Sequence, residues 1–279
     1  MNSEYAIEIK IRKIVLQAIL VCGLIMTLTP FFWMISTSFK SNAGIHAMPP
    51  QWLPKEPTLS HYRALFEEIN FFRYFVNSTI VAVIVTALGL FFNSLAGYAF
   101  AKFRFPGRDR IFAILIIALM VPSQVTMMPV FLILKKFGLL NSYMGLIVSG
   151  TISVYSIFLM RQFVMTIPNE LIESARIDGC SEIGIYWKII MPLCKPVLAT
   201  LGIFTFMSSW NSFLWPLIVM IREEMYTLPV ALANLSGQHA EKFGLVMAGA
   251  VIVVIPVIIV FLFAQKYIIE GISTTGLKG

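Results

Sequence analysis

The 279-residue chain is 58% hydrophobic and only 13% charged, with a formal net charge of +7. Soluble globular proteins carry about 25% charged residues, because a surface that faces water needs a polar shell. The composition therefore excludes an ordinary soluble domain and predicts an integral membrane protein. The 21 Lys and Arg residues lie between long apolar runs. This is typical of residues that flank membrane spans, and it does not indicate a nucleic-acid-binding protein.

Six long stretches of the chain contain no Asp, Glu, Lys or Arg. Each exceeds the roughly 20 apolar residues that a membrane-spanning helix needs, so we expect one span within each stretch. The stretches are 14–39, 74–101, 111–134, 137–160, 196–221 and 243–265. The predicted fold is an all-α integral membrane protein, in which residues 1–279 form one transmembrane domain of six helices.

The first stretch follows a basic segment with Lys10, Arg12 and Lys13, as a signal peptide would. It is too long for a signal peptide and has no small-residue cleavage site, so we expect a retained span. With the N-terminus inside, 13 of the Lys and Arg residues fall on the cytoplasmic side and 8 on the outer side. By the positive-inside rule, both termini are predicted to be cytoplasmic.

Two connecting segments are long enough to carry structure of their own. The outer one, residues 40–73, has helical apolar spacing from Leu59 to Phe72. It could form an amphipathic helix on the membrane surface or pack against the ends of the spans. The cytoplasmic one, residues 161–195, has Pro168 at a helix start and Gly179 at a helix end, and a second helix is predicted from Ser181.

Prolines fall within several of the predicted spans, where we expect them to kink the helices. They are Pro30, Pro122, Pro129, Pro216 and Pro256. Such kinks suit a transporter that changes shape, although prolines are also generally more frequent in membrane helices than in soluble ones.

Several kinds of functional group are absent from the sequence, and their absence reduces the number of possible functions. The six stretches contain no ionisable carboxylate, Lys, Arg or His, which weakens but does not exclude a self-sufficient secondary carrier of a small polar solute. There is no GxxxxGK[ST] loop for ATP and no catalytic Ser/His/Asp or HExxH set. The three Cys and three His residues are scattered, so we expect no metal site and no disulfide framework. A transporter without a coupling group of its own needs a partner that supplies energy.

Modest polarity remains within the spans. Amide and hydroxyl side chains mark the second, third and fifth stretches, and in the fifth they flank tryptophans. The polar residues of the second stretch are Asn77, Ser78, Asn93 and Ser94. Amide, hydroxyl and aromatic groups together suit a sugar, and the predicted substrate path consists of Gln124, Ser209, Trp210 and Asn211. The alternative interpretation, hydrogen bonds to neighbouring helices and interfacial tryptophans, is the stronger one for any single residue.

A specific motif lies in the long cytoplasmic segment. The run from Glu173 to Gly179, ESARIDG, is followed after about nine residues by IIMP, which ends at Pro192. The run resembles the EAA loop of permease subunits in binding-protein-dependent ABC importers, with Ser174 and Met191 as mild departures from its pattern. Further stretches resemble the carbohydrate-uptake branch of that family, close to maltose-type second permeases. These are 30–40, 97–107, 209–216, 226–229 and 276–279.

The resemblance implies an inward sugar transporter of the bacterial or archaeal cytoplasmic membrane. Its partners would be a second homologous permease, two ATPase subunits and an extracytoplasmic solute-binding protein. ATP and magnesium would be held by the ATPase subunits, with no cofactor in this chain. The residues implied in the ATPase contact are Glu173, Ala175, Asp178 and Gly179.

Overall fold

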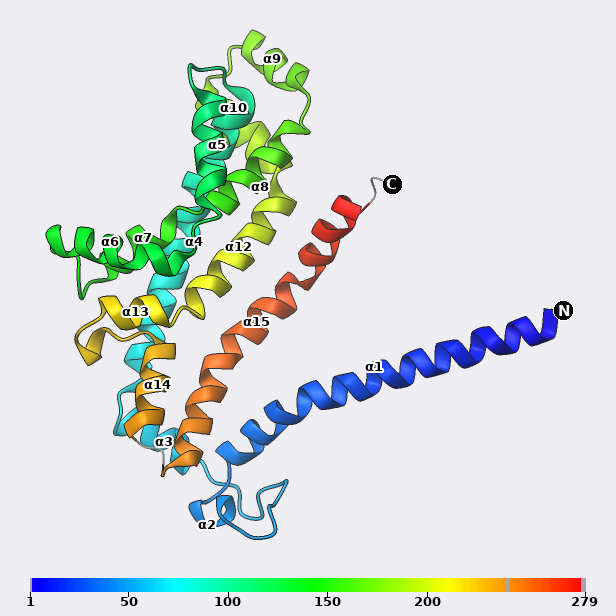
Figure 1. Cartoon of the computed structure of the whole chain (residues 1–279), viewed down its shortest axis with the longest axis vertical. Helices are drawn as coiled ribbons and strands as arrows, with labels where there is room; N and C mark the ends of the chain where they lie inside the picture. The colour runs from blue at the N-terminus through cyan, green and yellow to red at the C-terminus, as the bar shows by residue number, and fades with distance from the viewer. Residues whose placement is uncertain (1, 239–240, 277–279) are drawn as a thin grey trace. The chain divides into compact units, whose positions relative to one another are not determined.

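The computed structural model describes residues 2–238 and 241–276, and within them every regular element is helical (Figure 1). The elements are α1 (Asn2–Ser38), α2 (Asn42–Ile45), α3 (Ser60–Glu67), α4 (Phe71–Lys102), α5 (Arg108–Ala118), α6 (Ser123–Lys136), α7 (Tyr143–Thr151), α8 (Val154–Met165), α9 (Asn169–Ile177), α10 (Glu182–Ile185), the π-helix η1 (Tyr186–Ile190), α11 (Met191–Leu193), α12 (Lys195–Trp210), α13 (Leu214–Val219), the 3₁₀-helix η2 (Glu223–Met225), α14 (Leu228–Gln238) and α15 (Phe243–Gly276). The all-α prediction is confirmed for the described part of the chain.

Four helical segments are long and apolar enough to cross a membrane. They are Lys10–Ser38, Phe71–Lys102, Tyr143–Met165 and Phe243–Phe263. Two bent pairs would raise the number to six if each pair is one span. The helices α5 and α6 meet at 107°, and the Glu182–Leu193 segment meets α12 at 82°.

The helices are interrupted inside three of the predicted stretches, and the stretch 137–160 is divided at Ile152 and Ser153, between α7 and α8. The stretch 111–134 is divided at Pro122, which precedes α6 and has no N–H to continue the helical hydrogen bonds of α5. The stretch 196–221 is divided at Asn211, which caps α12, and a separate short helix follows. Counting the residues between charges identifies stretches long enough to span a membrane, but it does not show whether the helix is bent or broken within a stretch.

The chain forms two compact units, and the first comprises residues 1–70 and 234–254. Its connecting loop is held by local bonds around Lys40, whose backbone oxygen lies 2.9 Å from Nε2 of His61. The ammonium of Lys40 lies 3.9 Å from the centroid of the Trp33 ring, and burial lowers its pKa. A Cβ at Gly244 would collide with the His61 ring, so only glycine fits beside this histidine. These contacts favour a packed helix over a surface-bound one for α3, of which His61 and Leu65 are buried.

The second unit comprises residues 71–233 and 255–279, and α4 packs there against α7, α8 and α12. The approach of α8 is close because Gly97 has no side chain. An added Cβ at this position would lie 2.7 Å from Cβ of Met160. Small residues allow helix backbones to approach in this way inside a membrane, as we expect for this pair.

The polar residues of α4 serve the fold, which was the stronger of the two interpretations. Asn93 donates from Nδ2 to the Thr151 carbonyl at 3.0 Å and accepts at Oδ1 from the Ser153 N–H at 3.1 Å. It thereby satisfies backbone groups freed by the break between α7 and α8, as buried non-helical backbone requires in a membrane. Asn77 similarly donates to the carbonyls of Glu224 and Tyr226, both at 2.9 Å.

Candidate coupling site and solute cavity

The helix α9 is a short element whose two ends are fixed by local sequence. Pro168 precedes it with extended backbone, and Gly179 follows it with φ of +80°. The N–H of Gly179 donates to the Arg176 carbonyl at 3.0 Å, and the N–H of Cys180 donates to the Ala175 carbonyl at 2.9 Å. This pair of bonds is a Schellman motif, which needs a left-handed residue that glycine supplies without steric cost. Both predicted helix ends are confirmed.

One face of α9 packs on the chain itself. Ile172 and Ala175 are 2% and 8% exposed and belong to a buried cluster with Met160, Val164 and Ile185. Ala175 was expected at the contact with another subunit. The structure places it in the interior instead, because α9 carries apolar residues on both faces and these two face inward.

The opposite face of α9 is exposed. Residues spaced by three and four positions share a face of a helix, and Glu170, Glu173, Ser174 and Ile177 have this spacing. All four are exposed, and the side chain of Ile177 is 86% exposed. Among the predicted contact residues, Glu173 lies on this outward face, while Asp178 and Gly179 are exposed at the end of the helix. The strongly exposed Ile177 was missed, although its seven-residue separation from Glu170 could have revealed it.

Two polar clamps fix α9 to the helix α4. At its start, Nζ of Lys102 donates to the Ile167 carbonyl at 2.5 Å and to Oδ1 of Asn169 at 2.8 Å. At its end, Nε of Arg176 donates to Oε1 of Glu182 at 2.6 Å, and the Tyr98 hydroxyl donates to Oε2 of Glu182 at 3.2 Å. The hydrogen bond to Glu182 raises the pKa of the Arg176 guanidinium. A displacement of α9 therefore acts directly on both clamps.

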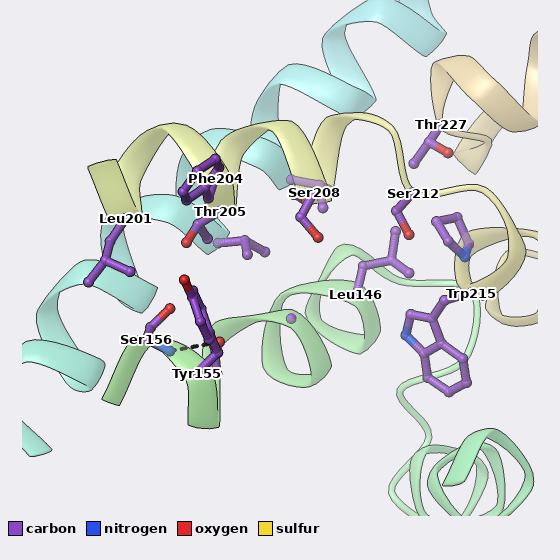
Figure 2. A pocket seen from close by; sticks show the side chains of 16 residues that line it. Leu146, Tyr155, Ser156, Leu201, Phe204, Thr205, Ser208, Ser212, Trp215 and Thr227 are labelled. Carbon is purple, nitrogen blue, oxygen red and sulfur yellow. Dashed lines mark hydrogen bonds between the residues drawn. The ribbon is translucent and has the colours of Figure 1, made fainter. Parts of the chain in front are cut away.

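A separate cavity of about 360 Å³ lies within the second unit (Figure 2). Its walls come from α4, the break between α7 and α8, the C-terminal half of α12, and the chain that follows α12. In Figure 2, the hydroxyl groups of Thr205, Ser208 and Ser212 point from the α12 side toward the α7–α8 side. The lining residues are Val81, Val85, Leu146, Gly150, Ser153, Tyr155, Ser156, Leu201, Phe204, Thr205, Ser208, Ser209, Ser212, Trp215, Pro216 and Thr227.

The cavity contains one of the four residues predicted for the substrate path. Ser209 lines it, but Gln124, Trp210 and Asn211 do not. Trp210 is 1% exposed and packs between the rings of Phe75 and Phe206. Asn211 caps α12 with its side chain exposed, and Gln124 is exposed on α6. The prediction followed hydroxyl, amide and indole groups together, and only its hydroxyl residue lines this cavity.

The missed residues do have a sequence signal. Thr205, Ser208, the predicted Ser209 and Ser212 are separated by three, four and seven positions, so the first three form a hydroxyl stripe along one side of α12, and Ser212 continues it in the break after Trp210. Trp215 continues this spacing, three positions after Ser212 and seven after Ser208, whereas Tyr155 faces the cavity from α8 and no local spacing connects it to the stripe.

Comparisons with known proteins place the chain in a family. The family model of the binding-protein-dependent transport system inner membrane component matches residues 89–274. The arabinooligosaccharides transport system permease protein AraQ of Bacillus subtilis strain 168 is 40% identical over 227 residues, which is 81% of each chain. The sulfoquinovosyl glycerol transport system permease protein SmoH of Agrobacterium fabrum strain C58 is 32% identical over 271 residues, 96% of this chain and 94% of SmoH.

A solved structure of a transporter chain is also similar to this protein. A chain of a bacterial ABC transporter involved in import of the acidic polysaccharide alginate superposes with a TM-score of 0.83 at 28% identity. The match covers 92% of this chain and 96% of the other. The chain therefore belongs to the family of binding-protein-dependent transport system inner membrane components, as a permease subunit of an ABC importer.

Proposed function

We propose that this subunit moves a sugar or sugar-like solute inward across the cytoplasmic membrane, driven by ATP hydrolysis on partner subunits. The observation that carries the proposal is the construction of α9. Its inner face is packed into the chain at Ile172 and Ala175, its end is clamped by Arg176, and its outer face exposes Glu173 and Ile177. An anchored helix with a free mixed apolar and acidic face is suited to receive force from another protein.

The proposed contact follows from this geometry. Glu173, Ile177, Asp178 and Gly179 face an ATPase subunit, whereas Ala175 acts from the inside by holding the helix on its own chain. ATP and magnesium are bound by two ATPase subunits, because this chain has no phosphate-binding loop. A second homologous permease completes the pathway, and an extracytoplasmic binding protein delivers the solute. The chain is thus a transporter subunit and not an enzyme in its own right.

The proposed membrane arrangement counts the bent pair of α5 and α6 as one span, and it takes the fifth span from α12 and the chain that follows it, without the Glu182–Leu193 segment. Residues 1–279 then form a single transmembrane domain of six spans, with residues 161–195 and both termini in the cytoplasm. The proposal rests on six apolar stretches and on the 13-to-8 distribution of Lys and Arg. It places the protein in the cytoplasmic membrane of a bacterium or archaeon.

Reconstitution tests the function. The complete complex of two permeases and two ATPases is placed in liposomes with the loaded binding protein outside and ATP inside. We expect sugar uptake that stops when the ATPase subunits carry a hydrolysis-blocking substitution. Uptake that continues with blocked ATPase subunits, driven by a proton or sodium gradient, would establish the secondary carrier instead.

Reporter fusions test the topology independently. Fusions at Gly107 and Glu170 are expected to report cytoplasm, and fusions at Lys55 and Gly237 the outer side. A phosphatase active only outside and a fluorescent protein active only inside give opposite signals at each position. An outer-side signal at Gly107 would reverse the proposed orientation.

A further inference from the structure

The cavity beside α12 has a lining of uniform chemistry. Its sixteen residues include eight with hydroxyl groups and none with a charged side chain. A charged solute would leave water here without finding a counter-ion among the residues that line the cavity, and burial of an unpaired charge is strongly unfavourable. The volume of about 360 Å³ is at the lower end of the range of about 300–1,000 Å³ for small-molecule sites. The cavity therefore fits a small neutral solute or one unit of a longer one.

The hydroxyls of the stripe are free to bind. Within the described residues, the side chains of Thr205, Ser208, Ser209 and Ser212 make no hydrogen bond to the protein. Thr227 is 4% exposed, and its Oγ1 is buried without a partner in the described part of the chain. A hydroxyl can both donate and accept, and a buried hydroxyl without a partner is costly. A ligand with many hydroxyl groups is complementary to such a surface.

Aromatic rings supply the other part of the lining. Tyr155, Phe204 and Trp215 all border the cavity. The indole of Trp215 is held in place because its Nε1–H donates to Ser149 Oγ at 2.7 Å, and Ser149 donates in turn to the Gly145 carbonyl at 2.7 Å. The faces of such rings carry partial negative charge, which attracts the polarised C–H groups on the face of a sugar ring.

We propose that this cavity is a binding site for one uncharged sugar unit in transit, with the α12 stripe as its hydrogen-bonding wall and Trp215 as its stacking ring. The proposal rests on the importer function proposed above and specifies its substrate as a neutral carbohydrate. Ser208 and Ser212 bind sugar hydroxyls, and Thr227 turns about its side-chain bond to gain the partner that it lacks. Uronic-acid sugars are disfavoured in this subunit because no cation lines the site.

A binding measurement tests the site directly. The complete complex is held in its ATP-bound state by a non-hydrolysing ATPase variant, and the retention of radiolabelled arabinotriose, xylotriose, maltotriose and a mannuronate trisaccharide is measured. We expect the wild-type complex to retain a neutral trisaccharide, and the Ser208→Ala/Ser212→Ala variant to need an about tenfold higher concentration. Thr200→Ala is the matched control, since its hydroxyl lies on the same helix but bonds to the Pro196 carbonyl at 3.1 Å and lies outside the cavity.

A second pair of variants tests the ring. Trp215→Phe keeps an aromatic face and Trp215→Leu removes it, while both lose the bond to Ser149. We expect the phenylalanine variant to retain the neutral sugar about fivefold better than the leucine variant.

The possible outcomes distinguish a failure of the proposed sugar site from a failure of the proposed importer function. Wild-type ATP-driven uptake together with unchanged binding in the double serine variant, or equal binding by both Trp215 variants, would overturn the sugar site and leave the importer intact. Preference for the mannuronate trisaccharide would overturn the neutral-substrate inference alone. A wild-type complex without ATP-driven uptake of any of the four sugars would contradict the proposed function and the cavity site with it.

Discussion

Replacing Glu173 with lysine is expected to lower ATP-driven uptake by at least about tenfold while the protein reaches the membrane at its normal level. Glu173 is exposed on the outward face of α9 and makes no hydrogen bond within the described residues, and its charge contributes only a minor part of the raised pKa of Arg176. The substitution therefore leaves the fold of this chain intact. A reversed charge in a contact with another subunit costs a few kcal/mol where the group is desolvated, and each 1.4 kcal/mol is a factor of about ten in affinity.

The measurements are ATPase-subunit binding, stimulated ATP hydrolysis and uptake by the purified complex. Glu68→Lys is the control, because Glu68 is also an exposed glutamate but lies at the C-terminal end of α3, outside the proposed contact. Wild-type transport by the Glu173 variant would mean that α9 does not receive force from the ATPase.

The backbone at Gly179 gives a second test of the same contact. With φ of +80° and open space around its Cα, Gly179→Val strains the turn without a collision. Gly138→Val is matched to it, since Gly138 has φ of +67° and equally open surroundings between α6 and α7. We expect loss of ATPase stimulation only for the Gly179 variant. Equal losses from both variants would attribute the effect to general destabilisation.

The ends of α9 could be predicted because local rules determine them. A proline before the first turn and a left-handed glycine after the last one act within a few residues, so the sequence contains the whole signal. The inner face could not be predicted in the same way. Leu171, Ile172, Ala175 and Ile177 distribute apolar groups around a nine-residue helix, and only the position of the buried cluster selects Ile172 and Ala175.

The cavity, like α9, could be predicted from the sequence only in part. The stripe from Thr205 to Ser212 follows from helical spacing, but the opposing wall depends on the break between α7 and α8. That break is stabilised by Asn93, about sixty residues away along the chain. Long-range hydrogen bonds of this kind leave no periodic pattern, and the tryptophan-rich run suggested Trp210 although that ring is buried between others.

Glu182→Gln is expected to reduce the number of sugar molecules imported per ATP by about fivefold, with ATPase binding retained. Glu182 connects α9 to α4, because its carboxylate accepts from Arg176 at 2.6 Å and from Tyr98 at 3.2 Å. The neutral amide weakens the ion pair with Arg176, whose side chain is 43% exposed. A partly exposed pair of this kind contributes about 1 kcal/mol, which corresponds to a factor of about five. The readout is the ratio of uptake to ATP hydrolysed in the same liposomes.

Glu67→Gln is the matched control for this ion pair. Glu67 pairs with Arg63 at 3.9 Å on α3, with the two side chains 69% and 77% exposed. We expect this variant to keep the wild-type ratio, since α3 does not take part in the proposed coupling. A reduced ratio in both variants would show that loss of any surface pair disturbs the complex.

Exchanging the charges then separates the two bonds of Glu182. Arg176→Glu alone places two carboxylates together and is expected to uncouple strongly, whereas Arg176→Glu/Glu182→Arg restores an ion pair between α9 and α10. A guanidinium at position 182 cannot accept from the Tyr98 hydroxyl but could donate to it, so the exchange is made in the Tyr98→Phe background, where neither bond can form. In one outcome, the exchange restores the ratio of uptake to ATP hydrolysed only in part, while Tyr98→Phe alone loses the part that is not restored. This result would show that the bond between Glu182 and Tyr98 transmits the displacement of α9 to α4. Full rescue by the exchange and wild-type coupling in Tyr98→Phe would instead confine the role of Glu182 to holding α9 against α10, and the displacement of α9 would then reach α4 only through the clamp at Lys102.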